Sequence, residues 1–146
     1  MNKDDAKWLM ESLRKIKFFS TFSLENIDSV LRLFQKHTFP KNKTIINESD
    51  PGKAFYIIHS GKVGVFKKKA LWIKTKLAEL IPGDFFGEMS LISDQFATAT
   101  IISIENTEVF VLLKSDFDDI LIKNPELAVE LLRVTENRRI DTQTKA

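Results

Sequence analysis

The chain has 146 residues, 43% of them apolar, and its 22 Lys and Arg residues nearly balance its 20 Asp and Glu residues. This length predicts one compact domain, residues 1–146, with a sizeable core. The formal charge of +2 is too small to indicate nucleic acid or an anionic membrane as a partner. The lack of cysteine excludes disulfides and thiolate metal sites and suits a cytoplasmic protein. No apolar run is long enough for a membrane span, and the polar start predicts no signal peptide.

Helical periodicity marks the N-terminal region, residues 1–38. Residues 4–15 carry a partly apolar stripe that predicts a first helix. Residues 17–22 are expected to break it, and Ser23 has the side chain of an N-cap for the next helix. That second helix is expected to end by His37.

Between residues 39 and 114 the pattern changes to short apolar runs separated by turn residues. Lys67-Lys68-Lys69 is expected to form a solvated hairpin tip. Many short strands with regular turn signals predict a sandwich or barrel. The expected strands are residues 44–46, 54–58, 62–66, 71–80, 98–104 and 108–113.

Helical signals return in residues 115–140. Ser115 is predicted to cap one helix, with Asp118 as the reciprocal partner of a capping box. Asn124 and Pro125 begin another helix, because Asn suits the N-cap and Pro the first helical position. An apolar stripe on this helix is expected to pack on the strands, on a second copy of the chain, or over a ligand; it consists of Leu127, Leu131 and Val134.

Residues 82–100, PGDFFGEMSLISDQFATAT, are the most informative stretch. Pro82-Gly83-Asp84 predicts a turn, and residues 87–91 predict a single helical turn. Gly87 lets a ligand approach the backbone closely, and the first N–H groups of such a turn favour an anion. Residues 97–102 are small or β-branched and predict a strand.

This stretch resembles the phosphate-binding cassette of the cyclic nucleotide-binding domain family. A second segment, ESDPGKAFYIIHSGKV at 48–63, resembles another signature of the same family, so the resemblance covers nearly the whole chain. It implies a mainly β protein: a β jelly-roll barrel with N-terminal helices and a C-terminal helix. The cassette residues that match are Phe86, Gly87, Glu88, Met89, Ser90, Leu91, Thr98, Ala99 and Thr100.

The resemblance also assigns roles. In the family a Glu holds the ribose 2′-hydroxyl and an Arg pairs with the cyclic phosphate; Glu88 matches the first, and Ala97 stands at the second. Loss of the Arg is expected to weaken binding by one to several decades. A lysine from residues 67–69 or 74–76 could replace the charge. The expected ligand-binding residues are Phe86, Gly87, Glu88, Met89, Ser90, Ala97 and Thr98.

Each assignment has a structural alternative. Glu88 could simply cap the cassette turn, and Met89 and Leu91 are expected to contribute to the core. Thr98 stands where family members that prefer cyclic GMP often carry Thr, although Thr also suits a strand.

The sequence therefore predicts a stand-alone, non-enzymatic regulatory module for signal transduction that binds cyclic AMP or cyclic GMP weakly. The alternative is a degenerate domain that no longer binds cyclic nucleotides and serves as a protein-interaction scaffold or takes another small ligand. The C-terminal helix could join a homodimer or a partner protein. No DNA-binding domain is expected, because the chain stops at Ala146.

Catalysis has little support in the residues. The chain has two histidines, His37 and His59, and neither belongs to a recognisable nucleophile–base arrangement. His59 is expected to be structural. Histidine spacings typical of metal sites are absent, so neither a metal nor a cofactor is expected.

Overall fold

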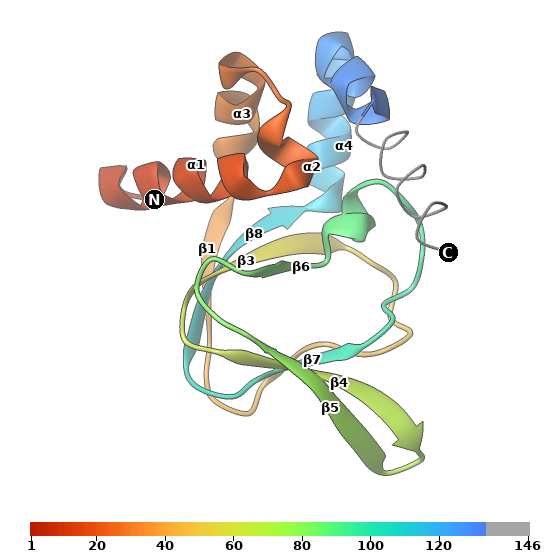
Figure 1. The fold of residues 1–146 in the computed structure, drawn as a ribbon. Coiled ribbons are helices and arrows are strands. Elements are labelled where there is room, and N and C mark those ends of the chain that lie inside the picture. The colour runs from red at the N-terminus through yellow and green to blue at the C-terminus, as the bar shows by residue number, and fades with distance from the viewer. Residues whose placement is uncertain (134–146) are drawn as a thin grey trace. The chain divides into compact units, whose positions relative to one another are not determined.

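The computed structural model describes residues 1–133, which fall into two compact units (Figure 1). One unit is helical and contains Met1–Leu33 with the chain from Ser115 onward. The other, Phe34–Lys114, contains the described strands. The first part of the helical unit ends at Leu33, whereas the sequence places residues 1–38 with the N-terminal helices.

The first part of the helical unit contains three helices: α1 (Lys3–Lys15), α2 (Lys17–Ser20) and α3 (Leu24–Leu31). The predicted cap of α3 is confirmed, because the Ser23 hydroxyl accepts a hydrogen bond from the Asn26 N–H at 3.2 Å. The first helix is interrupted as predicted, because α1 ends at Lys15 and Ile16 is extended, but residues 17–20 of the expected break form the short helix α2. Phe18 and Phe19 of α2 are fully buried, and the ring of Phe18 lies 6.4 Å from that of Phe117. Aromatic packing thus supports a helix that has no local signal of its own.

The C-terminal part of this unit begins with α4 (Lys114–Lys123). The prediction that Ser115 caps a helix is wrong, because α4 follows its preceding strand directly and Ser115 lies inside it. The Asn124 cap is confirmed: its side-chain oxygen accepts from the Leu127 N–H at 3.4 Å, and helix follows over residues 125–133. In the predicted stripe Leu127 is buried, Leu131 is half-buried, and Val134 lies outside the described residues.

The strand unit is built from two four-stranded antiparallel sheets, ordered β1-β8-β3-β6 and β2-β7-β4-β5 (Figure 1). The two sheets form a jelly roll rather than a closed barrel, so the predicted mainly β fold with flanking helices is confirmed. The strands are β1 (Gln35–Phe39), β2 (Thr44–Ile46), β3 (Ala54–Ser60), β4 (Val63–Ala70), β5 (Ile73–Leu80), β6 (Phe85–Phe86), β7 (Thr100–Ser103) and β8 (Thr107–Leu113).

Long-range pairing decides two boundaries in this region. The helix expected to end by His37 ends at Leu31, as predicted, and β1 takes up residues 35–39 by pairing with β8 over its whole length. The Lys67–Lys69 segment is not a hairpin tip, because it lies inside β4 and pairs with β5. The turn falls instead at Leu71 and Trp72.

β7 begins later than the sequence predicts. Residues 97–99 precede the strand, and Ala97 pairs with the 49–50 segment: the Ala97 N–H donates to the Asp50 carbonyl, and the Ser49 N–H donates to the Ala97 carbonyl, both at 2.8 Å. This irregular stretch of the cassette is therefore held by two backbone hydrogen bonds.

The core of the roll is an apolar cluster between the sheets, with buried Ile58, Phe86, Ile101, Val109 and Val111 among its members. Within residues 1–133, no helix is both long and apolar enough to cross a bilayer.

Glu108 on β8 is held by a histidine and a lysine. His59 Nδ1 lies 2.5 Å from Glu108 Oε1, and Lys36 Nζ lies 3.4 Å from the same oxygen. The hydrogen bond with His59, and then that with Lys36, lowers the pKa of Glu108, although desolvation opposes the shift. His59 thus has the structural partner expected of it.

A group with a depressed folded-state pKa stabilises the fold above its unfolded pKa, about 4.3 for Glu, and loses that contribution as pH falls through the folded pKa. Glu108→Gln should therefore cost about 1 kcal/mol of unfolding free energy at pH 7 and almost nothing in strong acid. Urea unfolding at neutral and acid pH measures both values. Glu11→Gln, exposed on α1, is the matched control. A cost for Glu108→Gln that does not change with pH would contradict this reading.

Candidate functional site

A cavity of about 610 Å³ lies within the strand unit and is lined by both sheets and by the turn η1 (Glu88–Leu91). All seven residues predicted to bind a ligand line this cavity: Phe86, Gly87, Glu88, Met89, Ser90, Ala97 and Thr98. The two ends of the cassette, separated by the polar 93–95 segment, therefore meet at one site.

The cassette turn is confirmed as helical, because η1 is a short 3₁₀ helix that begins after Gly87. Gly87 has φ +79°, in the left-handed region that favours glycine, and a methyl group there would lie 2.5 Å from the Ala54 carbonyl oxygen. Leu91 is 2% exposed and anchors the turn, whereas Met89 is 38% exposed. The core prediction for these two residues is thus right for Leu91 and wrong for Met89.

Gly52 allows a second close approach between the chain and the cassette turn. A methyl group on Gly52 would lie 2.5 Å from the Ser90 hydroxyl oxygen. The Ser90 carbonyl accepts a hydrogen bond from Lys114 Nζ at 3.0 Å. The turn is therefore fixed on one side by its close approach to β3 and on the other by the ammonium of Lys114, the first residue of α4.

An aromatic pair forms part of the cavity. Tyr56 on β3 and Phe86 on β6 are register partners, and their rings stack at 4.7 Å with an angle of 10°. Burial raises the pKa of Tyr56, so its phenol stays neutral at neutral pH and can donate a hydrogen bond. The sequence did not single out Tyr56 as a ligand contact, although it lies in the second segment that resembles the family. Its place beside the cassette depends on the pairing of β3 with β6.

Ala97 and Thr98 lie on the cavity wall without a cationic side chain of their own. The ammonium of Lys67 nevertheless reaches this wall, since its Nζ donates to the Thr98 carbonyl at 2.7 Å. The same nitrogen is 3.7 Å from Glu48 Oε1, and the Lys67 side chain is 52% exposed. A lysine from the region expected to offer a substitute charge therefore lies next to the residue that follows Ala97.

The cavity lining contains four ionisable residues, Asp50, Lys53, Tyr56 and Glu88, and is otherwise largely apolar. Within residues 1–133, no cluster of three or more His, Asp or Glu side chains is placed to hold a metal ion. The lining residues that the sequence did not single out as ligand contacts include Ile45, Ile46, Val65, Phe96 and Ile101.

The sequence profile of the cyclic nucleotide-binding domain matches residues 36–124, which is more than half of the chain. The chain belongs to the cyclic nucleotide-binding domain family. Its match to this family spans most of the strand unit, the cassette and α4. The predicted family membership is therefore confirmed.

Relatives within this family include two proteins with regulatory names. The cyclic AMP receptor protein of Thermus thermophilus is 32% identical over 120 residues, which cover 82% of this chain and 56% of that protein. The cAMP-dependent protein kinase regulatory subunit of Hypocrea atroviridis is 28% identical over 109 residues, 75% of this chain and 22% of that protein. The chain thus spans about half the length of the first and about a fifth of the second.

A solved structure of similar size has the same fold. The N-terminal domain of a transcriptional regulator from Streptomyces coelicolor superposes with a TM-score of 0.81 at 26% identity, covering 92% of this chain and 94% of that one. The similarity extends beyond the strand unit, because the match covers nearly the whole length of both chains.

Gly87→Ala tests the close approach of the cassette turn to β3. We expect it to cost about 3 kcal/mol or more, because the new methyl group combines left-handed strain with a clash against the Ala54 carbonyl. Gly83→Ala is the matched control: its φ is +93°, but nothing lies within 4 Å of the new methyl group. That variant should cost only about 1–2 kcal/mol. Equal costs in chemical denaturation would show that the contact with β3 does not constrain the turn.

Proposed function

We propose that this chain is a non-enzymatic sensor module whose cavity binds a cyclic nucleotide, cyclic AMP or cyclic GMP. The observation that carries the proposal is the convergence of all seven cassette residues on one cavity in a member of this family. The cavity volume of about 610 Å³ suits a ligand of nucleotide size. The names of the relatives, a cyclic AMP receptor and a cAMP-dependent kinase regulatory subunit, support the same ligand class.

The lining offers a partner for each part of such a ligand. The Glu88 carboxylate can accept a hydrogen bond from the ribose 2′-hydroxyl. The hydroxyl groups of Ser90 and Thr98 can donate to the cyclic phosphate. The stacked Tyr56 and Phe86 rings provide apolar surface for the base or sugar. These roles use the geometry of the cassette and need no catalytic group.

The phosphate end is the weak part of this site. Ala97 provides no guanidinium, so the two charge-assisted hydrogen bonds of an Arg fork are missing. Lys67 offers a partial replacement: its ammonium has three donors, one of which is used by the Thr98 carbonyl, and about half of its side chain is exposed. A single ammonium near Glu48 should hold a phosphate less firmly than a bidentate guanidinium, so we infer weak binding.

Ala97→Arg tests the missing clamp. Calorimetric titration with cyclic AMP and cyclic GMP should show tighter binding in the variant, by about tenfold to a thousandfold, because bonds to charged groups contribute roughly 1.5–3 kcal/mol each. Ala78→Arg, exposed on β5 and outside the cavity lining, controls for added charge. If neither the unmodified chain nor Ala97→Arg shows measurable binding of cyclic AMP or cyclic GMP, the proposed function is contradicted.

Lys67→Gln tests the substitute cation. It should weaken cyclic AMP binding by about tenfold and leave the binding of adenosine, which lacks the phosphate, unchanged. Lys69→Gln, on the same strand and also exposed, is the control. Equal loss of both ligands would show that Lys67 only maintains the wall, and no loss would show that it does not contact the phosphate.

A second candidate function is a protein-interaction scaffold with a disabled pocket. It is favoured by Ala97, which removes the phosphate clamp, and by Val129 and Leu132, which are 49% and 65% exposed on the helix over residues 125–133. Such side chains could meet a second copy of the chain or a partner protein. Binding of cyclic nucleotide only after Ala97→Arg would favour this candidate over a working sensor.

A further inference from the structure

The β4–β5 hairpin carries an exposed apolar tip. Leu71, Trp72 and Ile73 are 89%, 93% and 59% exposed. β4 pairs with β7 only as far as Phe66, so beyond that point β4 and β5 pair only with each other. Figure 1 shows the two strands extending away from the rest of their sheet as a separate arm. We call residues 67–76 the arm. A contiguous apolar group of this kind marks an interaction site more often than scattered exposed side chains do.

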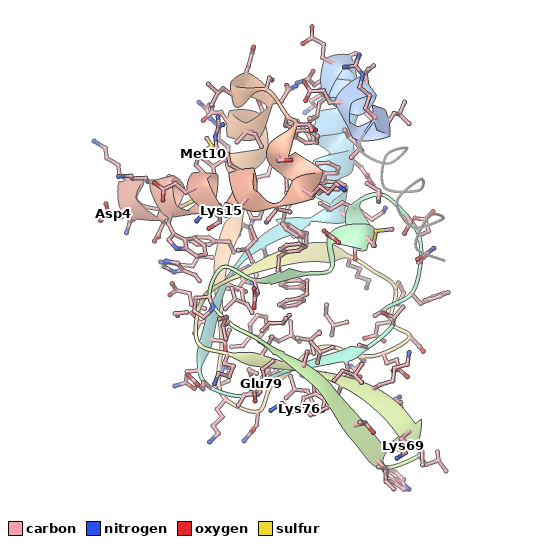
Figure 2. All side chains as sticks on the ribbon, viewed as in Figure 1. Asp4, Met10, Lys15, Lys69, Lys76 and Glu79 are labelled. Carbon is pink, nitrogen blue, oxygen red and sulfur yellow. The ribbon has the colours of Figure 1, made fainter. Side chains whose placement is uncertain are left out.

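Positive charge surrounds this tip. The arm reads KKKALWIKTK, with five lysines and no acidic residue. Lys67 is bonded to the Thr98 carbonyl, and Lys76 pairs with Glu79. Within residues 1–133 the side chains of Lys68, Lys69 and Lys74 make no hydrogen bond or ion pair. Figure 2 shows Lys69 toward the end of the arm, beyond the Lys76–Glu79 pair.

The arrangement of these lysines is costly in water. Lys68 and Lys74 lie directly opposite each other in the β4–β5 register. Like charges at such positions destabilise an antiparallel pair. An anionic surface would offset the repulsion between the lysines, and an apolar layer next to that surface would bury the exposed side chains of the tip. One partner would thus account for both unfavourable features.

We propose that the arm docks on the surface of an anionic lipid bilayer. Trp72 lies at the level of the headgroups with Leu71 and Ile73 beside it, and Lys68, Lys69 and Lys74 meet the anionic headgroups. The net charge of +2 gave no argument for a membrane because acidic residues elsewhere cancel this local concentration. The proposal does not depend on what the cavity binds.

A bilayer fits the arm better than a protein does. A stable protein interface buries about 800 Å² on each partner, usually on a broad surface, whereas this tip is a narrow two-stranded turn with cations on both strands. Trp is enriched at the headgroup level of membranes because its ring is amphipathic. Each lysine close to an anionic leaflet contributes about fivefold to binding.

Vesicle co-sedimentation tests the proposal with phosphatidylcholine vesicles, alone and with about one third phosphatidylserine. The unmodified chain should bind only the anionic vesicles, and less at high salt. The triple variant Lys68→Gln, Lys69→Gln, Lys74→Gln should bind about a hundredfold more weakly. A second triple variant with the same net charge is the control: Lys3→Gln, Lys7→Gln, Lys123→Gln, all exposed in the helical unit. It should bind almost as well as the unmodified chain.

Tryptophan fluorescence gives a second measurement. The chain has two Trp residues, so Trp8→Phe leaves Trp72 as the single reporter. Its emission should shift to the blue on anionic vesicles, and Trp72→Ser in the full chain should reduce binding without affecting the fold, since this side chain is 93% exposed. Three results would overturn the proposal: no vesicle binding, equal losses in the two triple variants, or an unshifted Trp72 emission in the vesicle-bound protein. The first of these would point to an acidic protein partner instead.

Discussion

The close approach of the cassette turn to the start of β3 is the constraint on which the site depends. Gly87 can lie against the Ala54 carbonyl only because it has no side chain and accepts a left-handed conformation. Gly52 meets Ser90 in the same way. These two contacts bring η1 onto the edge of a strand whose next inward residue, Tyr56, stacks on Phe86. Without them the turn would move away from β3, and the cavity would lose the wall that carries the proposed ribose and phosphate contacts.

The electrostatics of this wall differ from what the family resemblance implies. The cassette keeps its acidic residue, Glu88, but has Ala97 where a phosphate-pairing Arg is expected, so its own side chains favour the sugar more than the phosphate. A cation next to Thr98 comes from another strand. Lys67 bonds to Thr98 at the point where the β4–β5 arm leaves the sheet. If the cavity binds a phosphate as proposed, that anion would compete with Glu48 for the Lys67 ammonium.

Several features set by short-range chemistry could be predicted from the sequence, although the helix cap expected at Ser115 was wrong because α4 continues directly from β8. The caps at Ser23 and Asn124 and the turn after Gly87 each depend on a few adjacent residues, and each was found as predicted. Features set by distant partners could not. β1 forms because it pairs with β8 along its whole length, and α2 forms because its Phe side chains are buried among other rings. Strand register, which no local pattern encodes, decides two further contacts. These are the stacking of Tyr56 on Phe86 and the hydrogen bond from Lys67 to the Thr98 carbonyl.

Amide chemical-shift mapping with cyclic AMP tests the central claim most directly, because it reports where a ligand sits as well as whether it binds. The account predicts saturable shifts centred on Gly87, Glu88 and Thr98, with smaller shifts at Tyr56 and Lys67. Gly87, Glu88, Thr98 and Tyr56 come from separate parts of the chain and line the cavity together, and Lys67 bonds to the Thr98 carbonyl. Absence of shifts at millimolar ligand, or shifts confined to residues outside this set, would contradict a nucleotide site at the cassette and leave the family fold without its ligand.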